Sequence, residues 1–348
     1  MSSVLTITDV DPADPDGFKA YHDVYLAASR HGPQGEYSVP WQLEEARVAL
    51  ADPDARRIRL AWAGRVDQQV VATGWLEGST VDNTDVANVL VCCHPDHRGR
   101  GHAAAMLAQV EEQARAHGRS RLVGEVTWPY TAGADGTGSA ELAWARRQGF
   151  EVGLVDVQRR LPLPVPLERL DALAAEAAVH HEGYLLRSFT GPVPEELAEG
   201  WVALSSSLMT EAPMGDIERE QETADVAALR AEEAMLVEQG RVKVSTVVAA
   251  PPEESGEREL VAYTYIAVSV HESDRGYQWG TLVRPDHRGH RLGLAVKVAN
   301  LRLLQETQPQ LTTLVTFNAD VNAPMVAVNE RLGFRPVQWL GELQRRLG

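Results

Sequence analysis

The pentapeptide Pro-Asp-His-Arg-Gly occurs twice in this chain, at residues 95–99 and 285–289. Each copy follows an apolar run that is typical of a strand and precedes a run with the apolar spacing of a helix. A strand, a glycine-bearing turn and a helix that recur in this way predict a fold duplicated within the chain. The length of 348 residues agrees, because one domain usually holds about 100 to 200 residues.

The elements predicted around the two pentapeptides follow the same order in both halves, and each half ends a helix with Gly-Phe, at 149–150 and 333–334. Between the halves, prolines at 162, 164 and 166 precede an alanine-rich stretch that favours a short helix. The sequence therefore predicts an N-terminal domain over residues 1–165, a linker with a short helix over 166–182 and a C-terminal domain over 183–348.

The net charge is −16, from 33 basic and 49 acidic residues. Such a charge repels nucleic acids and anionic membrane surfaces and favours a cationic partner. The first residues lack the basic and apolar regions of a signal peptide, and no uncharged run is long enough to span a bilayer. We therefore expect a cytoplasmic protein that binds neither nucleic acid nor membrane.

The chain has 2 cysteines, Cys92 and Cys93, which are adjacent in a strand-like run. Neighbouring residues of an extended strand point to opposite faces, so these two cannot form an ordinary disulfide. We expect reduced, buried side chains in preference to reactive thiols. No Cys/His spacing resembles a metal site, so no bound metal is expected.

The first pentapeptide leads into a turn with the sequence Arg98-Gly-Arg-Gly-His-Ala103. A strand that turns directly into a helix leaves the first N–H groups of the helix unpaired, and together with the helix dipole these groups attract an anion. Glycine lets the backbone lie directly against a phosphate because it has no Cβ. The turn is therefore either a phosphate-binding loop or a tight turn without a ligand.

The pattern Arg-x-x-Gly-x-Ala after an apolar strand, with a later helix that ends in Gly-Phe, resembles the GNAT superfamily of acyl-CoA-dependent N-acyltransferases. The resemblance covers both halves. It implies an α/β (α+β) fold of two tandem GNAT-like domains, each with a mixed central sheet flanked by helices. It also implies that the turn holds the pyrophosphate of coenzyme A, with acetyl-CoA as the cofactor.

The two copies depart from the family pattern in different ways. The second copy has Arg291 at the position of the first glycine and keeps Gly293, so the arginine side chain must either turn away or fold over the phosphates. Its stretch Asn322 to Asn329 is similar to the final helix of the family, whose leading asparagine contacts the cofactor. The first copy keeps the glycine but has Gly138 and Ala145 at the two asparagine positions.

The resemblance assigns one set of cofactor-binding residues to each half. The first set is Val91, Cys93, Arg98, Gly99, Arg100, Gly101, His102 and Ala103. The second set is Leu282, Val283, Arg288, Gly289, His290, Arg291, Leu292, Gly293, Asn322 and Asn329. The members on the fourth strand of each half are implied as backbone partners of the pantetheine amides and of the thioester oxygen.

Acyl transfer to an amine needs an acid that protonates the departing thiolate. Many relatives use a tyrosine on the final helix, where this sequence has Asn329 and Ala145. The substitutes are Tyr263, Tyr265 and Tyr277. Each of them can instead be an ordinary half-buried residue of a sheet.

The reaction also needs a base that accepts a proton from the amine. Glu125 is a candidate because a carboxylate within an apolar strand needs a reason, although pairing with an arginine or facing solvent would explain it. The turn after the third strand of the second half offers His271, Glu272 and Asp274, which can also be simply solvated. The acceptor is implied to enter over the loop at 208–218, where the candidate substrate-binding residues are Glu211 and Asp216.

The sequence thus predicts an N-acetyltransferase that moves an acetyl group from acetyl-CoA to an amine of a small molecule. The acidic loop favours a cationic acceptor. The C-terminal domain is favoured as the catalytic one, because it carries both asparagines. The alternative is a non-catalytic acyl-CoA-binding or sensor protein, which the missing tyrosine and Arg291 both allow.

Overall fold

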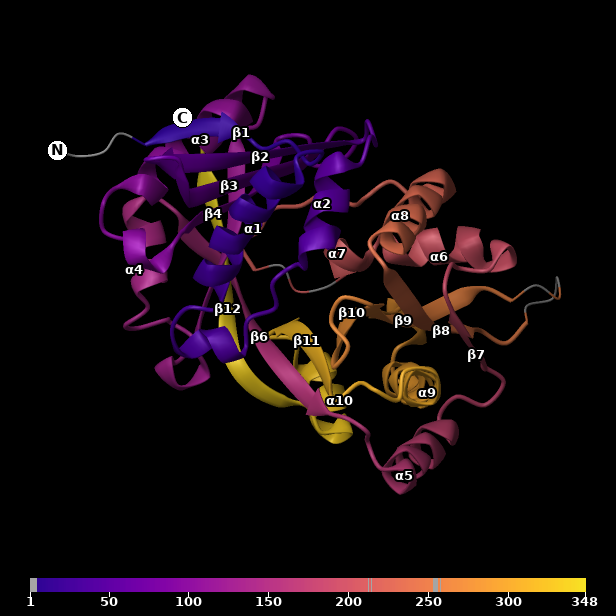
Figure 1. The fold of residues 1–348 in the computed structure, drawn as a ribbon. Coiled ribbons are helices and arrows are strands. Elements are labelled where there is room, and N and C mark those ends of the chain that lie inside the picture. The colour runs from indigo at the N-terminus through magenta and orange to yellow at the C-terminus, as the bar shows by residue number, and fades with distance from the viewer. Residues whose placement is uncertain (1–4, 212, 214, 253–255, 257) are drawn as a thin grey trace. The chain divides into compact units, whose positions relative to one another are not determined.

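A computed structural model of the chain describes residues 5–211, 213, 215–252, 256 and 258–348 (Figure 1). The chain forms two compact units. The first unit comprises residues 1–156, 214–219 and 338–348, and the second comprises 157–213 and 220–337. Within the described ranges, no helix combines the length and the apolar character needed to cross a membrane.

The first unit holds a sheet with the strand order β1-β2-β3-β4-β5-β12. Its pairs are antiparallel except β4 with β5, which run parallel. The elements are β1 (Thr6–Asp9), α1 (Pro15–Ser29), η1 (Pro33–Glu36), α2 (Leu43–Ala51), β2 (Arg57–Val66), β3 (Gln69–Ser79), β4 (Val86–Cys93), η2 (Pro95–His97), α3 (His102–Ala116), β5 (Arg121–Pro129), η3 (Tyr130–Ala132), α4 (Ala140–Arg147) and most of β12 (Arg335–Arg346).

Helix α3, which follows the first pentapeptide, is held against the sheet by one apolar face. Met106, Leu107, Val110 and Ala114 are buried, and their spacing places them on the same side of the helix. The helix packs on β3 and β4. This packing fixes the start of α3 at the end of β4, where the turn lies.

The last strand of the chain completes the first unit. β12 pairs with β5 in antiparallel register from Gln338↔Pro129 to Arg346↔Arg121. Leu343 is 3% exposed. This differs from the sequence boundaries, which gave residues 338–348 to the C-terminal domain. A local sequence pattern can predict that a segment forms a strand. Which strand it pairs with depends on contacts between residues far apart in the sequence.

The second unit holds the strand order β11-β10-β9-β8-β7. The pairs β10–β9, β9–β8 and β8–β7 are antiparallel, and β10–β11 is parallel. The elements are α5 (Leu167–Ala178), β7 (Leu185–Thr190), η4 (Glu195–Leu197), α6 (Ala198–Ser205), α7 (Leu208–Glu211), α8 (Val226–Glu238), β8 (Arg241–Ala249), β9 (Leu260–Ser269), β10 (Arg275–Val283), η5 (Pro285–His287), α9 (Leu292–Thr307), β11 (Thr313–Ala319) and α10 (Ala323–Leu332), and β6 (Glu151–Pro162) leads into the unit.

Helices cover both faces of the second sheet (Figure 1). On one face α9 and α5 share a core with β8 and β9, which includes Leu170, Leu294 and Ile266. On the other face α6 and α8 pack through Trp201 and Leu229. The predicted α/β class, with mixed sheets flanked by helices, is confirmed. The helix expected within the linker at 166–182 is α5, and it belongs to the core of the second unit.

Candidate functional site

The first turn presents backbone N–H groups toward open space. It joins β4 to α3, and Gly99 and Gly101 have φ values of 75° and 85°, in the left-handed region that suits glycine. A Cβ added at either glycine would meet nothing within 4 Å. In the described part of the chain, the N–H groups from Gly99 to Ala103 donate to no protein acceptor. The turn therefore offers a cradle of donors that fits a phosphate.

Two strands part beside the first turn. The parallel pairing of β4 with β5 ends at Asn88↔Val123, while β4 goes on to Cys93 and keeps its pairs with β3. The edge of β4 that holds Val91 and Cys93 is thus left without its neighbour. Such an edge can accept an extended amide chain as an added strand. Cys92 and Cys93 are both free, and burial raises the pKa of each thiol, so neither is a thiolate at neutral pH.

The side chains of the first turn leave the cradle open. Arg98 donates to Glu141 of α4 at 3.0 Å, and Arg100 is exposed and donates to the Asp96 carbonyl at 3.2 Å. His102 is buried at the start of α3, and burial lowers its pKa from the ordinary value, so the ring is neutral at pH 7. Arg98 and Arg100 therefore place positive charge at the edge of the turn.

The second turn repeats this geometry with one substitution. It joins β10 to α9, Gly289 has φ 89°, and no atom lies within 4 Å of an added Cβ there. Arg291 is the N-cap of α9 with φ 52°, in the left-handed conformation that Gly101 has in the first turn. Within the ranges that the structure describes, the N–H groups from Gly289 to Gly293 donate to no protein acceptor. The second turn therefore also offers a cradle for an anion.

The long side chains of the second turn all have partners inside the second unit. Arg288 donates to Glu211 of α7 at 3.0 Å, His287 lies 2.9 Å from the Tyr184 hydroxyl and His290 lies 3.0 Å from the His180 carbonyl. Arg291 pairs with Glu176 of α5. The sequence allowed the Arg291 side chain either to fold over the phosphates or to turn away. In the structure it turns away, toward Glu176.

β10 carries a bulge at the point where it leaves β11. The parallel pairing of β10 with β11 ends at Gln278↔Thr316. On its other side, the register with β9 shifts between Gln278↔Ile266 and Thr281↔Thr264. Trp279 and Gly280 therefore lie opposite the single residue Tyr265. A bulge of this kind leaves a backbone group outside the ladder, whereas β4 keeps an unshifted register with β3 from Ala72↔Cys93 to Glu77↔Asn88.

Aromatic side chains gather over the bulge. The Tyr265 ring lies so close to Gly280 that a Cβ on this glycine would approach Cε1 to 2.5 Å. Trp279 meets Tyr265 edge-on at 6.0 Å, and the Lys243 ammonium lies 5.0 Å from the centre of the Tyr265 ring. Burial raises the pKa of Tyr265 well above its ordinary value, so its hydroxyl is protonated at neutral pH. Tyr263, in contrast, is 1% exposed in the apolar core.

The asparagines of the final helix make contacts of their own. Asn322 caps α10 by accepting from the Met325 N–H at 3.3 Å. Asn329 is fully buried, accepts from the Lys297 ammonium at 2.8 Å and donates to Asn318. Burial lowers the pKa of Lys297 to about 7. Asn322 lies at the surface end of the helix, whereas the Asn329 amide is enclosed in the core.

Lys297 was missed from the sequence, although a signal was present. Leu294, Leu301 and Leu304 recur at helical spacing, and Lys297 falls on the same face. All four side chains are buried. A lysine among apolar residues at helical spacing is the sequence signal that indicates a buried Lys297.

Glu272, a candidate base, is already engaged at the hairpin between β9 and β10. It accepts a hydrogen bond from the Tyr277 hydroxyl and pairs with Arg275 at 3.3 Å. Burial and this hydrogen bond raise the pKa of Tyr277. The Tyr277 phenol is therefore neutral at pH 7, and its hydrogen bond already occupies the Glu272 carboxylate.

Glu125 faces a second carboxylate in the first unit. It stands just beyond the parting of β4 and β5 and lies directly opposite Glu342 in the register of β5 with β12. Solvent reaches the Glu125 side chain, but the surrounding protein limits its hydration, and this effect, with the Glu342 charge, raises its pKa to about 7. The Arg219 charge opposes the shift. Glu342 and Arg219 were missed because they are far from Glu125 in the sequence.

The two candidate substrate residues fall in different compact units. Glu211 ends α7 in the second unit and pairs with Arg288, and the Asp216 N–H of the first unit donates to the Gly153 carbonyl at 2.8 Å. Residues 212 and 214 of the expected acceptor loop lie outside the described residues.

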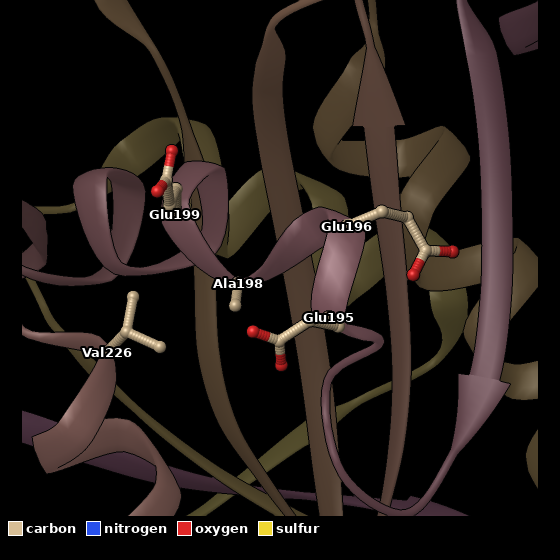
Figure 2. Close-up of a pocket in the computed structure, with 5 residues that line it drawn as sticks. All are labelled: Glu195, Glu196, Ala198, Glu199 and Val226. Atoms are coloured by element: carbon tan, nitrogen blue, oxygen red, sulfur yellow. The ribbon is translucent and has the colours of Figure 1, made fainter.

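A cavity of about 290 Å³ in the second unit contains none of the candidate residues (Figure 2). It is lined by Glu195, Glu196, Ala198, Glu199 and Val226.

Comparisons with known proteins agree with this fold. Residues 26–134 match the model of the acetyltransferase (GNAT) family. A solved tandem GNAT protein from the clavulanic acid biosynthesis pathway is 26% identical, with 99% of each chain covered and a TM-score of 0.79. A GCN5-related N-acetyltransferase from Sphaerobacter thermophilus has the same fold, at 16% identity and a TM-score of 0.63 over 99% of this chain and 96% of its own. No curated protein matches the sequence.

The family match falls on the first turn and the strands that part beside it, and the structural match extends over both units. The resemblance seen in the sequence is thereby confirmed. Residues 26–134 match the model of the acetyltransferase (GNAT) family, and the chain as a whole has the architecture of a tandem GNAT protein.

Proposed function

We propose that this protein is an N-acyltransferase that moves an acetyl group from acetyl-CoA to the amine of a small molecule, with catalysis in the second unit. One observation carries the proposal. A turn with unpaired N–H groups stands beside a strand that leaves its parallel neighbour, and in the second unit that strand carries a bulge at the same place. The first unit, which has no bulge in β4, is proposed to bind a cofactor without chemistry.

Acetyl-CoA supplies the acyl group as a thioester. The N–H groups from Gly289 to Gly293 would hold its phosphates, and the edge of β10 with Leu282 and Val283 would hold the pantetheine amides. A backbone N–H freed by the bulge at Trp279 and Gly280 would donate to the thioester oxygen, where negative charge develops during attack. The first turn, with Gly99 to Ala103, would hold the phosphates of a second cofactor.

The amine nitrogen forms a bond to the acyl carbon, the carbon–sulfur bond breaks, and one proton leaves the amine while another reaches the thiolate. Tyr265 is the proposed acid, because its neutral phenol packs on the bulge. Glu272 remains the proposed base of the second unit. Glu125 would take that role if transfer occurred in the first unit, because a pKa of about 7 suits a base at neutral pH.

A cationic acceptor is proposed from the net charge of −16 and, for the second unit, from Glu211. A non-catalytic acyl-CoA-binding or sensor protein is the second candidate. It is favoured by the burial of Asn329, at the position where relatives carry the acid. Release of free CoA from acetyl-CoA in the presence of a panel of primary amines distinguishes the two candidates.

Native mass spectrometry tests both turns. We expect two coenzyme A molecules per chain in the natural protein and one in either Gly99→Glu or Gly289→Glu, because the new carboxylate would stand in a phosphate cradle. Gly118→Glu and Gly191→Glu are matched controls, since both glycines also have positive φ and no atom within 4 Å of an added Cβ. The controls should keep two. Two molecules retained in both turn variants would refute the use of these turns.

Tyr265→Phe tests the proposed acid. We expect the turnover number with the best amine of the panel to fall by about tenfold to a hundredfold, with KM for acetyl-CoA unchanged, because the hydroxyl acts only on the departing thiolate. Glu125→Gln should leave turnover within about twofold, as expected for a residue of the non-catalytic unit. The opposite result for this pair of variants would move the chemistry to the first unit.

A further inference from the structure

Glu176 bridges two arginines beside the second turn. Its carboxylate pairs with Arg291, the N-cap of α9, and with Arg331 near the end of α10. The three side chains are 37–39% exposed, so solvent and a solute can reach the group. An internal carboxylate therefore occupies the position that an external anion would take between these two cations.

The packing of α5 places Glu176 there. Leu170, Leu173 and Ala177 bury one face of α5 in the core that contains Leu294 and Val298 of α9. Asp171, on the same helix, pairs with Arg302 of α9. The residues just after α5 reach the turn itself, where the His180 carbonyl accepts from His290. The position of Glu176 is thus set by a buried interface, and the carboxylate stays close to the turn.

The left-handed conformation of Arg291 brings this charge to the cradle. A non-glycine residue in this region costs roughly 1 to 2 kcal/mol relative to its usual conformations. The first turn avoids this cost with Gly101, which has no side chain to pair. The backbone of Arg291 forms part of the row of unpaired N–H groups, and its guanidinium is bound to Glu176 instead of a phosphate.

We propose that Glu176 competes within the chain with a phosphate group of acyl-CoA for Arg291, so that the second unit binds the cofactor more weakly than the first. The inference rests on the proposed function of the second turn. When a phosphate binds, Arg291 exchanges its contact with the carboxylate for a contact with the phosphate, and Arg331 keeps Glu176. The linker helix α5 thereby sets the affinity of the second site.

The test measures binding of CoA to the full chain by calorimetry, in a Gly99→Glu background in which only the second turn is open. Glu176→Gln should tighten binding by about threefold to tenfold, as expected for the loss of exposed ion pairs and of one nearby negative charge. Asp171→Asn is the matched control, because it removes the other carboxylate between α5 and α9. Its dissociation constant should stay within about twofold.

Two further arms identify the arginine and the phosphate. Adding Arg291→Gly to Glu176→Gln should remove most of the increase in CoA affinity, because that increase comes from the guanidinium that Glu176 no longer binds. Comparing CoA with 3′-dephospho-CoA shows which phosphate Arg291 contacts. If it contacts the 3′-phosphate, the increase in affinity caused by Glu176→Gln vanishes with 3′-dephospho-CoA. If it contacts the pyrophosphate, the increase persists. Either result supports competition by Glu176.

Other outcomes overturn the inference. If Glu176→Gln leaves the affinity unchanged or weakens it, or if Asp171→Asn tightens binding equally, Glu176 is no competitor. If the natural chain binds two CoA molecules and Glu176→Gln has no effect, only this inference fails. If the natural chain binds none, the proposed function fails with it.

Discussion

Removal of residues 338–348 is expected to unfold the first compact unit, although these are the last residues of the chain. They form the strand that pairs with β5 from Pro129 to Arg121, and they bury Trp339, Leu340 and Leu343. Their loss would expose the edge of β5 and the apolar residues beneath it, at a cost of several kcal/mol, comparable to the whole stability of a domain. Hydrogen exchange should show fast exchange in β4 and β5 and continued protection in β8 and β9.

Two single substitutions calibrate this result. Leu343→Ala should lower the free energy of unfolding of the first unit by about 2 to 5 kcal/mol, because the side chain is 3% exposed. Arg346→Ala, on the same strand but 72% exposed, should change it by about 0.5 kcal/mol or less. A truncated chain whose β5 amides stay protected would show that the last strand is dispensable.

The second large effect concerns Lys297. In the folded protein burial lowers its pKa to about 7, whereas in the unfolded chain it keeps its ordinary value of about 10.4. Between these values the unfolded state binds the extra proton, so the free energy of unfolding of the second unit rises with pH, by up to about 1.4 kcal/mol per pH unit. Below about pH 7 both states are protonated and this contribution stops changing. Lys297→Met should remove the rise.

Urea unfolding at pH 7.5, 8.5 and 9.5 measures the slope. The 19F resonance of a fluorotryptophan at Trp201 reports on the second unit alone, because this side chain is buried in its core. Lys19→Met is the control, since Lys19 is 61% exposed and pairs with Asp23 in the first unit. A rise with pH that persists in Lys297→Met would show that another group is responsible.

Local sequence patterns were sufficient for the parts of the fold that depend on neighbours in the chain. The strand, turn and helix around each pentapeptide are found where the apolar runs and glycines placed them. The cradle of N–H groups follows from the same pattern, because the first donors of a helix have no partner within the helix, and neither turn supplies a side-chain cap. For Arg291 the sequence left two positions of the side chain open, and the choice depends on Glu176, which is over a hundred residues away.

The rest of the site depends on contacts that no local pattern contains. Alternation along a strand predicts which side chains face the core, but it does not predict the neighbouring strand. The sequence therefore could not predict that Glu125 lies opposite Glu342 in the sheet. The bulge in β10 was also missed. Its signal was weak, since Gly280 is one of two glycines in β10 and Gly276 marks no bulge.

The pairing of β12 with β5 has a consequence for protein synthesis. The residues of the first unit up to 156 leave the ribosome long before 338–348 are made, and at about 5 to 20 residues per second the delay is roughly ten seconds or more. During this time β5 presents an unpaired edge to any protein that binds nascent chains. The part of the first unit that is translated first is therefore the part that finishes folding only after residues 338–348 have been made.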